Sequence, residues 1–364
     1  MEELFDPITL RGMKLPNRIV RSATSERAAD EQGRVTLDVR ELYKKLAQGG
    51  SGLVITGYTF IKEDGRCNPR QLGLSDDYHI EGMKALVKDF HASSGNGSKF
   101  CVQLVHGGRQ VPPDTKNPVA PSAVKEPVLG TEPRELFPEE IEELVLDFAE
   151  AARRARDAGF DAVQIHAAHG YLVSQFLSPY TNKRDDDWGG DPMRRARFLT
   201  EIIDRTRHEV GDIPILVKLN VEDGIEGGLT IEEGIGHAVA AFEAGADALE
   251  ISVGMLQTPK GKGAVRGPEG SGGEGYLLGL AAMVKERVKI PVIAVGGFRS
   301  RLVMQTVISG GQADMVAMAR PLIREPGLPK KFLEGKEIAD CISCSGCHKG
   351  EGPVHCARLG KGQV

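Results

Sequence analysis

The stretch Asp157-Ala-Gly-Phe-Asp-Ala-Val-Gln-Ile165 recurs later in the chain as Glu243-Ala-Gly-Ala-Asp-Ala-Leu-Glu-Ile251. In both copies an amphipathic segment ends at a glycine, which often terminates a helix because it adopts positive φ without strain. A short apolar run follows at once, as in a parallel strand that is buried on both faces. Weaker copies surround Gly52 and Gly311. We interpret the repeated unit as a helix followed by a parallel strand.

Eight apolar runs of this kind alternate with helical patterns along the chain. Such alternation predicts a single (β/α)8 TIM barrel of the α/β class, with a doubly wound open sheet as the main alternative. No linker interrupts the units, so we expect one barrel over residues 1–335 and a cysteine-containing C-terminal tail over residues 336–364. The expected strands are 18–23, 53–56, 100–105, 162–166, 215–219, 248–252, 291–295 and 315–319. The expected helices are 36–47, 78–91, 138–158, 193–210, 230–244, 276–288, 300–309 and 321–333.

The composition excludes several classes of protein. With 364 residues, 40% hydrophobic and 27% charged, the chain is neither disordered nor collagen-like. A net charge of −5 argues against non-specific nucleic-acid binding. No apolar run approaches the roughly 20 residues of a spanning helix, and the acidic start lacks the order of a signal peptide. We therefore expect a cytoplasmic protein without a nucleic-acid or membrane partner; the sequence allows a homo-oligomer but does not fix the oligomeric state.

Glycine is in excess, at 45 of the 364 residues, against roughly 7% in average proteins. This indicates many tight turns and backbone that lies close to a ligand. The letters Gly270-Ser-Gly-Gly-Glu-Gly275 match a dinucleotide fingerprint, but no βαβ unit surrounds them. We expect a loop over the barrel mouth at this point and no separate Rossmann domain.

In a (β/α)8 barrel the functional residues lie at the C-terminal ends of the strands. His166-Ala-Ala-His169-Gly-Tyr171 follows the fourth expected strand, so a turn there aims both imidazoles into one pocket. The pair has three interpretations: zinc ligands, two N–H donors to one oxygen, or buried packing histidines. Zinc lacks the His-Glu-x-x-His pattern and an obvious third ligand. Tyr171 adds a proton with an unperturbed pKa near 10.

A phosphate site is indicated between the last two strands. Gly296-Gly297 ends the seventh expected strand, and Ala319-Arg320 ends the eighth. Barrels commonly bind phosphate between these two loops through backbone N–H groups, and Arg320 adds a charge-assisted hydrogen bond. The alternative is that the glycines serve turns and Arg320 lies on a solvated face.

Several segments share their residues with one known family. On these segments the chain resembles the Old Yellow Enzyme family, the NADH:flavin oxidoreductases that act as FMN-dependent ene reductases. The family is a single (β/α)8 barrel with FMN across its strand ends, in agreement with the repeats. The segments are Pro16-Asn-Arg-Ile-Val20 with Ser22-Ala-Thr-Ser25; Gln103-Leu-Val-His-Gly-Gly-Arg109; His166-Ala-Ala-His-Gly-Tyr171; Leu177-Ser-Pro-Tyr-Thr-Asn182-Lys-Arg184 through Trp188-Gly189-Gly190 to Arg195-Ala-Arg197-Phe198; and Val295-Gly-Gly297 with Ala319-Arg320.

The resemblance implies how the reaction is divided among these residues. His166 and His169 would hydrogen-bond the substrate oxygen and polarise the double bond of an α,β-unsaturated carbonyl (enone-type) compound. Tyr171 would protonate the α-carbon while reduced flavin N5 delivers hydride to the β-carbon. NAD(P)H would first reduce FMN, leave, and be replaced by this small-molecule substrate on the same face.

The resemblance also implies the FMN contacts. Gln103 would bond the pyrimidine edge, and Lys218 would lie near N1 and O2, where the family usually has arginine. Tyr58 stands at a position where the family usually has a small residue, so it either narrows the flavin pocket or adds a second hydroxyl. Ser25 replaces the family's threonine or cysteine near flavin O4 and N5. The full set implied for FMN is Ser22, Ala23, Thr24, Ser25, Tyr58, Gln103, His166, Lys218, Gly296, Gly297, Ala319 and Arg320.

The tail carries Cys341-Ile-Ser-Cys344-Ser-Gly-Cys347 and, further on, Cys356. Two-residue spacings are typical of zinc and iron–sulfur ligands. The segment resembles the cluster segment of the dienoyl-CoA reductase and trimethylamine dehydrogenase branch, whose members carry an additional nucleotide-binding domain; we expect no such domain within these 364 residues. A [4Fe–4S] cluster, zinc and a metal-free tail remain the three alternatives.

Other functions compete with the NAD(P)H-dependent ene reductase. One is an FMN/iron–sulfur demethylase or dienoyl-CoA reductase-like enzyme that passes electrons through the tail. Another is a non-catalytic flavin-binding redox sensor. A non-flavin aldolase barrel is the last, with Lys218 as its Schiff-base lysine.

Overall fold

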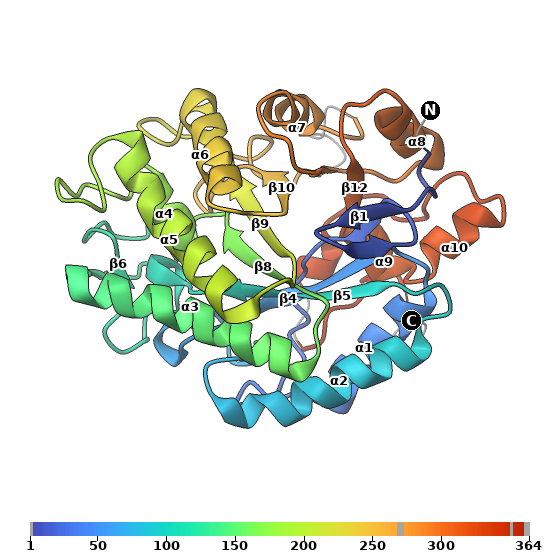
Figure 1. Ribbon diagram of the computed structural model, residues 1–364, viewed down its shortest axis with the longest axis horizontal. Coiled ribbons are helices and arrows are strands. Elements are labelled where there is room, and N and C mark those ends of the chain that lie inside the picture. Colours follow the sequence, from blue (N-terminus) through green and yellow to red (C-terminus); the bar gives the residue numbers. More distant parts are fainter. Residues whose placement is uncertain (1–2, 268–272, 350–351, 360–364) are drawn as a thin grey trace.

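The computed structural model of the chain describes residues 3–267, 273–349 and 352–359, and its centre is a closed barrel of eight parallel strands (Figure 1). Each barrel strand pairs with the next one along the chain, and the last pairs with the first. The prediction of a single (β/α)8 barrel is confirmed, and the open doubly wound sheet is excluded. Residues 268–272, which include the first half of the fingerprint match (270–272), lie outside the described residues. The barrel strands are β3 (Ile19–Arg21), β4 (Leu53–Phe60), β5 (Lys99–Val105), β8 (Ala162–Ala167), β9 (Ile215–Asn220), β10 (Ala248–Ser252), β11 (Val292–Val295) and β12 (Met315–Met318).

Helices surround the barrel and pack their apolar faces on it. The expected helix 321–333 is instead two short helices, because Pro326 has no N–H to donate and disfavours helical geometry at Glu325 (φ −135°, ψ 81°). The helices are α1 (Leu37–Gln48), α2 (Ile80–Ser93), α3 (Pro138–Ala158), α4 (Leu172–Leu177), α5 (Pro192–Val210), α6 (Ile231–Glu243), α7 (Leu278–Lys285), α8 (Arg301–Ser309), α9 (Arg320–Arg324) and α10 (Leu328–Leu333), with 3-10 turns η1 (Glu63–Gly65), η2 (Asp77–His79), η3 (Gly108–Gln110) and η4 (Gly346–His348).

The aspartates of the sequence repeat have a structural role. Asp161 accepts a hydrogen bond from the backbone N–H of Phe100 (2.8 Å), at the start of β5. Asp247 accepts one from Ile215 (2.8 Å), at the start of β9, and Asp314 makes the same contact with the start of β11. Each repeat therefore satisfies a backbone donor at the start of the preceding barrel strand.

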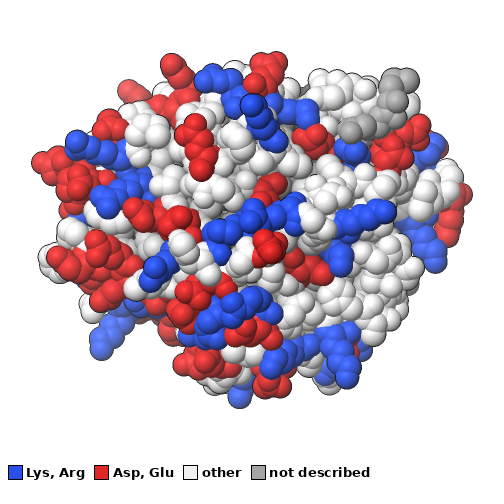
Figure 2. All heavy atoms as spheres, viewed as in Figure 1, with Lys and Arg blue, Asp and Glu red and all other residues white. Residues whose placement is uncertain are grey.

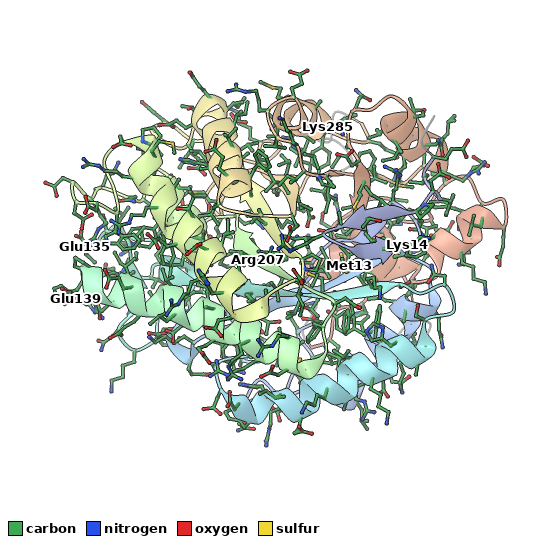
Figure 3. All side chains as sticks on the ribbon, viewed as in Figure 1. Met13, Lys14, Glu135, Glu139, Arg207 and Lys285 are labelled. Carbon is green, nitrogen blue, oxygen red and sulfur yellow. The ribbon has the colours of Figure 1, made fainter. Side chains whose placement is uncertain are left out.

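A hairpin that the sequence did not predict closes the N-terminal end of the barrel. Its strands β1 (Ile8–Leu10) and β2 (Met13–Leu15) are antiparallel, and Leu10 and Leu15 join the apolar cluster inside the barrel. Arg11 in the turn forms an ion pair with Asp247 (3.5 Å). Arg207 of α5, which is labelled in Figure 3, forms an ion pair with the same aspartate. A further short pair, β6 (Val119–Ala120) with β7 (Arg134–Glu135), lies outside the barrel.

The barrel interior changes from apolar to polar toward the C-terminal ends of the strands. The part of the interior nearer the N-terminal ends of the strands is filled by apolar residues such as Val20, Leu216 and Ile293. The next layer is polar and charged, although its residues are at most 5% exposed. Such groups are rarely buried unless they are paired, so this layer marks the functional end. Its members are Ser22, Gln103, Gln164, Lys218 and Glu250.

Acidic and basic side chains are interspersed on the face shown in Figure 2. Among the described residues, no helix combines the length and apolar character needed to cross a bilayer.

Candidate active site

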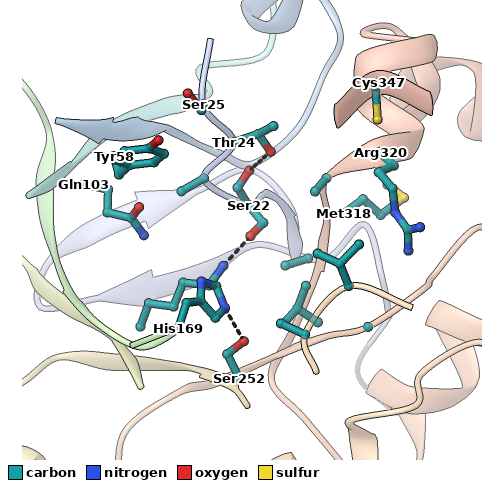
Figure 4. A pocket seen from close by; sticks show the side chains of 18 of the residues that line it. Ser22, Thr24, Ser25, Tyr58, Gln103, His169, Ser252, Met318, Arg320 and Cys347 are labelled. Atoms are coloured by element: carbon teal, nitrogen blue, oxygen red, sulfur yellow. Dashed lines mark hydrogen bonds between the residues drawn. The ribbon is translucent and has the colours of Figure 1, made fainter. Parts of the chain in front are cut away.

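A cavity of about 420 Å³ opens at the C-terminal ends of the barrel strands (Figure 4). Every residue that the sequence predicted for flavin or substrate lines it, including the catalytic candidates His166, His169 and Tyr171. The structure therefore brings together predicted residues from seven of the eight barrel strands and the loops that follow them, and Ser252 of β10 lines the cavity from the eighth. The sequence did not identify several other lining residues: Arg27, Asn68, Ala264, Val265, Tyr276, Phe298, Ser343 and Val354.

The two histidines form one wall of the cavity, with ring centroids 5.1 Å apart. The backbone N–H of Ala168 donates to His166 Nδ1 (3.3 Å), so a neutral His166 carries its proton on Nε2. His169 has φ +61°, in the left-handed region, and its N–H donates to Asn220 Oδ1 (3.2 Å). Its Nε2 lies 2.7 Å from Ser252 Oγ. These contacts fix the orientation of both rings.

Both imidazoles are neutral at pH 7. Burial lowers the pKa of His169 to about 3, and the nearby charge of Lys218 acts in the same direction. Burial, then the proximity of His169 and Lys218, also holds the pKa of His166 well below its ordinary value. Among the described residues no three His, Cys, Asp or Glu side chains form a metal site. The pair is therefore suited to donating hydrogen bonds rather than to holding zinc.

Tyr171, at the N-terminus of α4, completes this wall. Its ring centroid lies 4.8 Å from that of His166 and 5.5 Å from that of Tyr58. Burial, with the neighbouring Tyr58 second, raises the pKa of the Tyr171 hydroxyl well above its ordinary value. Tyr171 therefore holds its proton at neutral pH beside the two imidazoles.

A chain of buried hydrogen bonds crosses the barrel beneath the cavity. Lys218 Nζ lies 2.8 Å from Glu250 Oε1 and 2.8 Å from Ser22 Oγ, and Ser22 donates to the same carboxylate (2.5 Å). Gln164 Nε2 donates to Glu250 Oε2 (2.9 Å), and Gln103 Nε2 donates to Gln164 Oε1 (2.8 Å). A carboxylate only accepts, so Glu250 sets the direction of both amides. The Gln103 carbonyl oxygen is consequently left to face the cavity.

Glu250 remains ionised in this layer. Burial opposes the charge, but the Lys218 ammonium and hydrogen bonds from Lys218, Ser22 and Gln164 outweigh it, so the pKa of Glu250 lies below its ordinary value. The Lys218 amine is thus committed to an ion pair. This arrangement argues against a free Schiff-base lysine.

The opposite end of the cavity is built from glycine and arginine. Gly296 and Gly297 have φ of +137° and +78°, and a Cβ on Gly297 would lie 2.9 Å from the ring of Tyr276. Arg320 lies at the start of α9 and donates to the carbonyl of Arg266 (2.9 Å). Two glycines without side chains beside a guanidinium suit a phosphate. The polar side chains of Gln103 and Lys218 at one end of the cavity fit the flavin ring of FMN, and the glycines and Arg320 at the other end fit its phosphate.

The tail forms part of the cavity wall through Ser343, Cys347 and Val354. Arg27 donates to the Cys347 carbonyl (3.2 Å), and Arg320 donates to the Ser343 carbonyl (2.9 Å). The backbone N–H of Val354 donates to the carbonyl of Glu26 (2.8 Å). The sequence alone did not predict that the tail contacts the flavin cavity.

A second, smaller cavity lies beside the first and is lined by all four tail cysteines. All four are free thiols, and Arg324 Nη1 lies 3.6 Å from Cys356 Sγ. Within residues 3–267, 273–349 and 352–359, the cysteines are not arranged as a metal site. The cysteines are Cys341, Cys344, Cys347 and Cys356.

Comparison with known proteins identifies a family of NAD(P)H-dependent flavin oxidoreductases. The model of the NADH:flavin oxidoreductase / NADH oxidase family matches residues 3–338. The chain is 39% identical to an NADH oxidase of Thermoanaerobacter brockii over 94% of its length, which is 53% of that protein. It is 36% identical to an NADPH dehydrogenase of Geobacillus sp. (strain WCH70), covering 94% of this chain and 96% of that protein.

Solved structures agree. A 2-naphthoyl-CoA reductase superposes with a TM-score of 0.86 at 33% identity, over 96% of this chain and 54% of that one. An old yellow enzyme homologue from Zymomonas mobilis gives 0.80 at 27% identity, over 94% and 96%. The chain thus spans about half the length of the NADH oxidase and the 2-naphthoyl-CoA reductase, and nearly all of the NADPH dehydrogenase and the Zymomonas protein.

Proposed function

The chain belongs to the NADH:flavin oxidoreductase / NADH oxidase family, and on this premise we propose that it uses NAD(P)H and FMN to reduce the activated C=C bond of an α,β-unsaturated carbonyl compound. Membership in this family confirms the predicted resemblance to the Old Yellow Enzyme family. It also confirms the predicted class of enzyme, an FMN-dependent NAD(P)H oxidoreductase. The observation that best supports C=C reduction is that one wall of the cavity holds two neutral imidazoles and a protonated phenol.

When bound in this cavity, FMN would supply the hydride that the substrate takes up. At its ring, the Gln103 carbonyl faces the cavity as an acceptor, and Lys218 supplies a positive charge from beneath. At its other end, Gly296, Gly297 and Arg320 would hold the phosphate. The charge of Lys218 is held in place by Glu250, so it is available without reorganisation when negative charge develops above it.

The imidazoles polarise the substrate. His166 presents an Nε2–H, the His169 ring contacts Ser252, and Asn220 accepts a hydrogen bond from the His169 backbone N–H. Because both rings are neutral, they donate hydrogen bonds to the substrate oxygen without adding a second full charge beside Lys218. These donors stabilise the enolate-like charge that forms on that oxygen.

Tyr171 supplies the proton at the α-carbon. It lies on the same wall as the imidazoles and keeps its proton at neutral pH. Its proton leaves only when an acceptor as basic as an enolate carbon is formed beside it. Proton donation and carbonyl polarisation are thus divided between neighbouring side chains.

The test is an anaerobic two-step experiment on the FMN-loaded protein. NADH or NADPH should bleach the flavin, and 2-cyclohexenone should then restore its colour. Bleaching without recovery on any enone would contradict C=C reduction, and absence of bleaching would favour the flavin-binding redox sensor.

A second candidate is an FMN/iron–sulfur demethylase or dienoyl-CoA reductase-like enzyme. It is favoured by the placement of four cysteines around one cavity, with Cys347 also lining the flavin cavity. A [4Fe–4S] cluster or zinc there remains a proposal. Iron, zinc and acid-labile sulfide measured on anaerobically purified protein decide among cluster, zinc and metal-free tail.

A further inference from the structure

Tyr58 reaches the cavity because β4 contains a β-bulge. The pairing of β4 with β5 shifts register between Ile55 and Tyr58, where β4 has one extra residue. Hydrogen bonds build this irregularity: the Gly57 N–H lies 2.7 Å from Glu26 Oε1 and 2.9 Å from the Tyr43 hydroxyl. Bulges beside active sites commonly re-aim a side chain. Here the side chain that follows the bulge lines the flavin cavity.

The turn at residues 67–71 holds the Tyr58 side chain in one orientation. Asn68 Nδ2 donates to the Tyr58 hydroxyl (3.0 Å), and the Arg70 N–H donates to Asn68 Oδ1 (3.0 Å), which fixes the direction of this amide. Gln71 Nε2 donates to the Tyr58 carbonyl (3.0 Å), and the Cys67 N–H donates to Gln71 Oε1 (2.7 Å). Asn68 therefore occupies an acceptor position of the Tyr58 oxygen, and the Tyr58 proton is free to point elsewhere.

Tyr171 is the neighbour toward which that proton can point. The two rings are tilted by 31° with centroids 5.5 Å apart. Each hydroxyl affects the pKa of the other, and Ser25 is a further neighbour of the Tyr58 hydroxyl. Burial raises the pKa of Tyr58 to about 12, so both phenols are protonated at neutral pH. The cavity wall thus holds two phenols in series, with Asn68 behind the second.

We propose that Tyr58 is a positioning residue for proton delivery, which donates a hydrogen bond to Tyr171 while Tyr171 protonates the substrate. The proposal rests on the proposed role of Tyr171. The Tyr171 O–H bond breaks as the C–H bond at the α-carbon forms. The resulting phenolate is buried and would be costly without a donor. Tyr58 then passes its proton to Tyr171, and the charge moves to an oxygen that already accepts from Asn68. A proton taken up from bulk solvent then restores the Tyr58 hydroxyl.

The kinetic test uses Tyr58→Phe in the FMN-loaded enzyme, with Tyr78→Phe as the control. Tyr78 is 53% exposed, and its hydroxyl donates to the Gln32 carbonyl, far from this network. Flavin reduction by NAD(P)H should be unchanged in Tyr78→Phe, and it is measured separately in Tyr58→Phe because Tyr58 lines the flavin cavity. Reoxidation by 2-cyclohexenone should slow about 10- to 100-fold in Tyr58→Phe alone, the scale of one hydrogen bond to a charged group. Reoxidation at the wild-type rate across the pH range would overturn the proposal.

Asn68→Ala adds a test of the series. It should slow reoxidation when Tyr58 is present and have no effect in the Tyr58→Phe background, because Asn68 acts through the Tyr58 hydroxyl. If the two substitutions slow reoxidation by factors that multiply in the double variant, Asn68 and Tyr58 act independently. That result would overturn the proposal that Asn68 acts on Tyr171 through Tyr58.

A readout without substrate separates this proposal from the proposed function. The six tyrosines can be replaced by 3-fluorotyrosine, whose phenol ionises at lower pH, and followed by fluorine NMR. The Tyr58 and Tyr171 signals should each show two coupled ionisation steps. In Tyr58→Phe, Tyr171 should show one step that lies between them. If the Tyr171 titration is the same with and without Tyr58, the phenols are not coupled and the proposal fails. If the wild type reduces no enone but the coupling is present, only the proposed function fails.

Discussion

Replacing Glu250 with glutamine removes a carboxylate that contacts three side chains in the barrel. Lys218 loses its ion pair at 2.8 Å, and Ser22 and Gln164 lose the carboxylate that accepts their hydrogen bonds. The glutamine amide carries an NH2 group where Gln164 also presents one, so Gln164 must turn around. Gln103 is then no longer held with its carbonyl toward the cavity.

The magnitude follows from burial. Glu250 is 0% exposed and Lys218 is 5% exposed, so water cannot replace the lost contact. Removing one partner of a buried pair costs about 3–5 kcal/mol, because the other charge stays buried and uncompensated. Because glutamine retains one acceptor oxygen, we expect the free energy of unfolding to fall by an amount near the lower end of this range. A matched control is Glu337→Gln, which breaks an exposed pair with Arg301 at 3.1 Å and should cost about 1 kcal/mol or less.

The effect should depend on pH with a defined sign. The native pKa of Glu250 lies below its ordinary value, so its charged form stabilises the fold above the unfolded pKa of about 4.3. That contribution is lost as pH falls through the lower native pKa. The difference between wild type and Glu250→Gln should therefore be largest near pH 7 and shrink as the pH falls below about 4.

The assay is urea denaturation of both variants without FMN, followed by circular dichroism at pH 7 and at pH 4. FMN affinity at pH 7, measured from flavin fluorescence, should also fall in Glu250→Gln, since the Gln103 amide loses its fixed direction. If the Glu250→Gln midpoint matches that of Glu337→Gln at pH 7, the buried pair does not stabilise the fold as argued.

Three further predictions concern the cavity wall. The double variant His166→Ala/His169→Ala should keep FMN and its reduction by NAD(P)H but lose cyclohexenone reduction; retained reduction would refute the polarising role. Tyr171→Phe should slow flavin reoxidation by an enone roughly 10²- to 10⁴-fold, the usual contribution of a general acid, and stopped-flow absorbance at the flavin band would reveal a smaller effect. Gly297→Ala should weaken FMN binding at least about tenfold, because its Cβ would lie 2.9 Å from the Tyr276 ring at positive φ; titration of apoprotein with FMN measures this, and unchanged affinity would place the phosphate elsewhere.

The barrel and its strand ends could be predicted because parallel strands leave a simple pattern. A continuous apolar run after a helix-terminating glycine occurs at each strand, as before Ile165 and Ile251. The residue that follows such a run must lie at the cavity, whatever the side-chain details. This is why His166 and Gly297 could be placed from sequence.

Other features left weaker signals. Glu250 is a charged residue inside an apolar run, which could have marked the buried layer, but a run that is apolar on both faces does not tell which side faces the barrel axis. Asn68 belongs to an irregular turn whose contact with Tyr58 depends on the bulge. The hairpin strands at Ile8–Leu10 and Met13–Leu15 are too short for periodicity to be read.

The hairpin at the N-terminal end of the barrel has a consequence for how the site responds to salt. Leu10 and Leu15 seal an apolar layer beneath Lys218 and Glu250, so mobile ions cannot approach these charges from below. Screening over a Debye length of about 8 Å at physiological ionic strength acts on charges that face solvent. The field that Lys218 exerts on the flavin should therefore be nearly independent of ionic strength. We therefore expect the midpoint potential of bound FMN to depend more on these fixed neighbours than on the surrounding electrolyte.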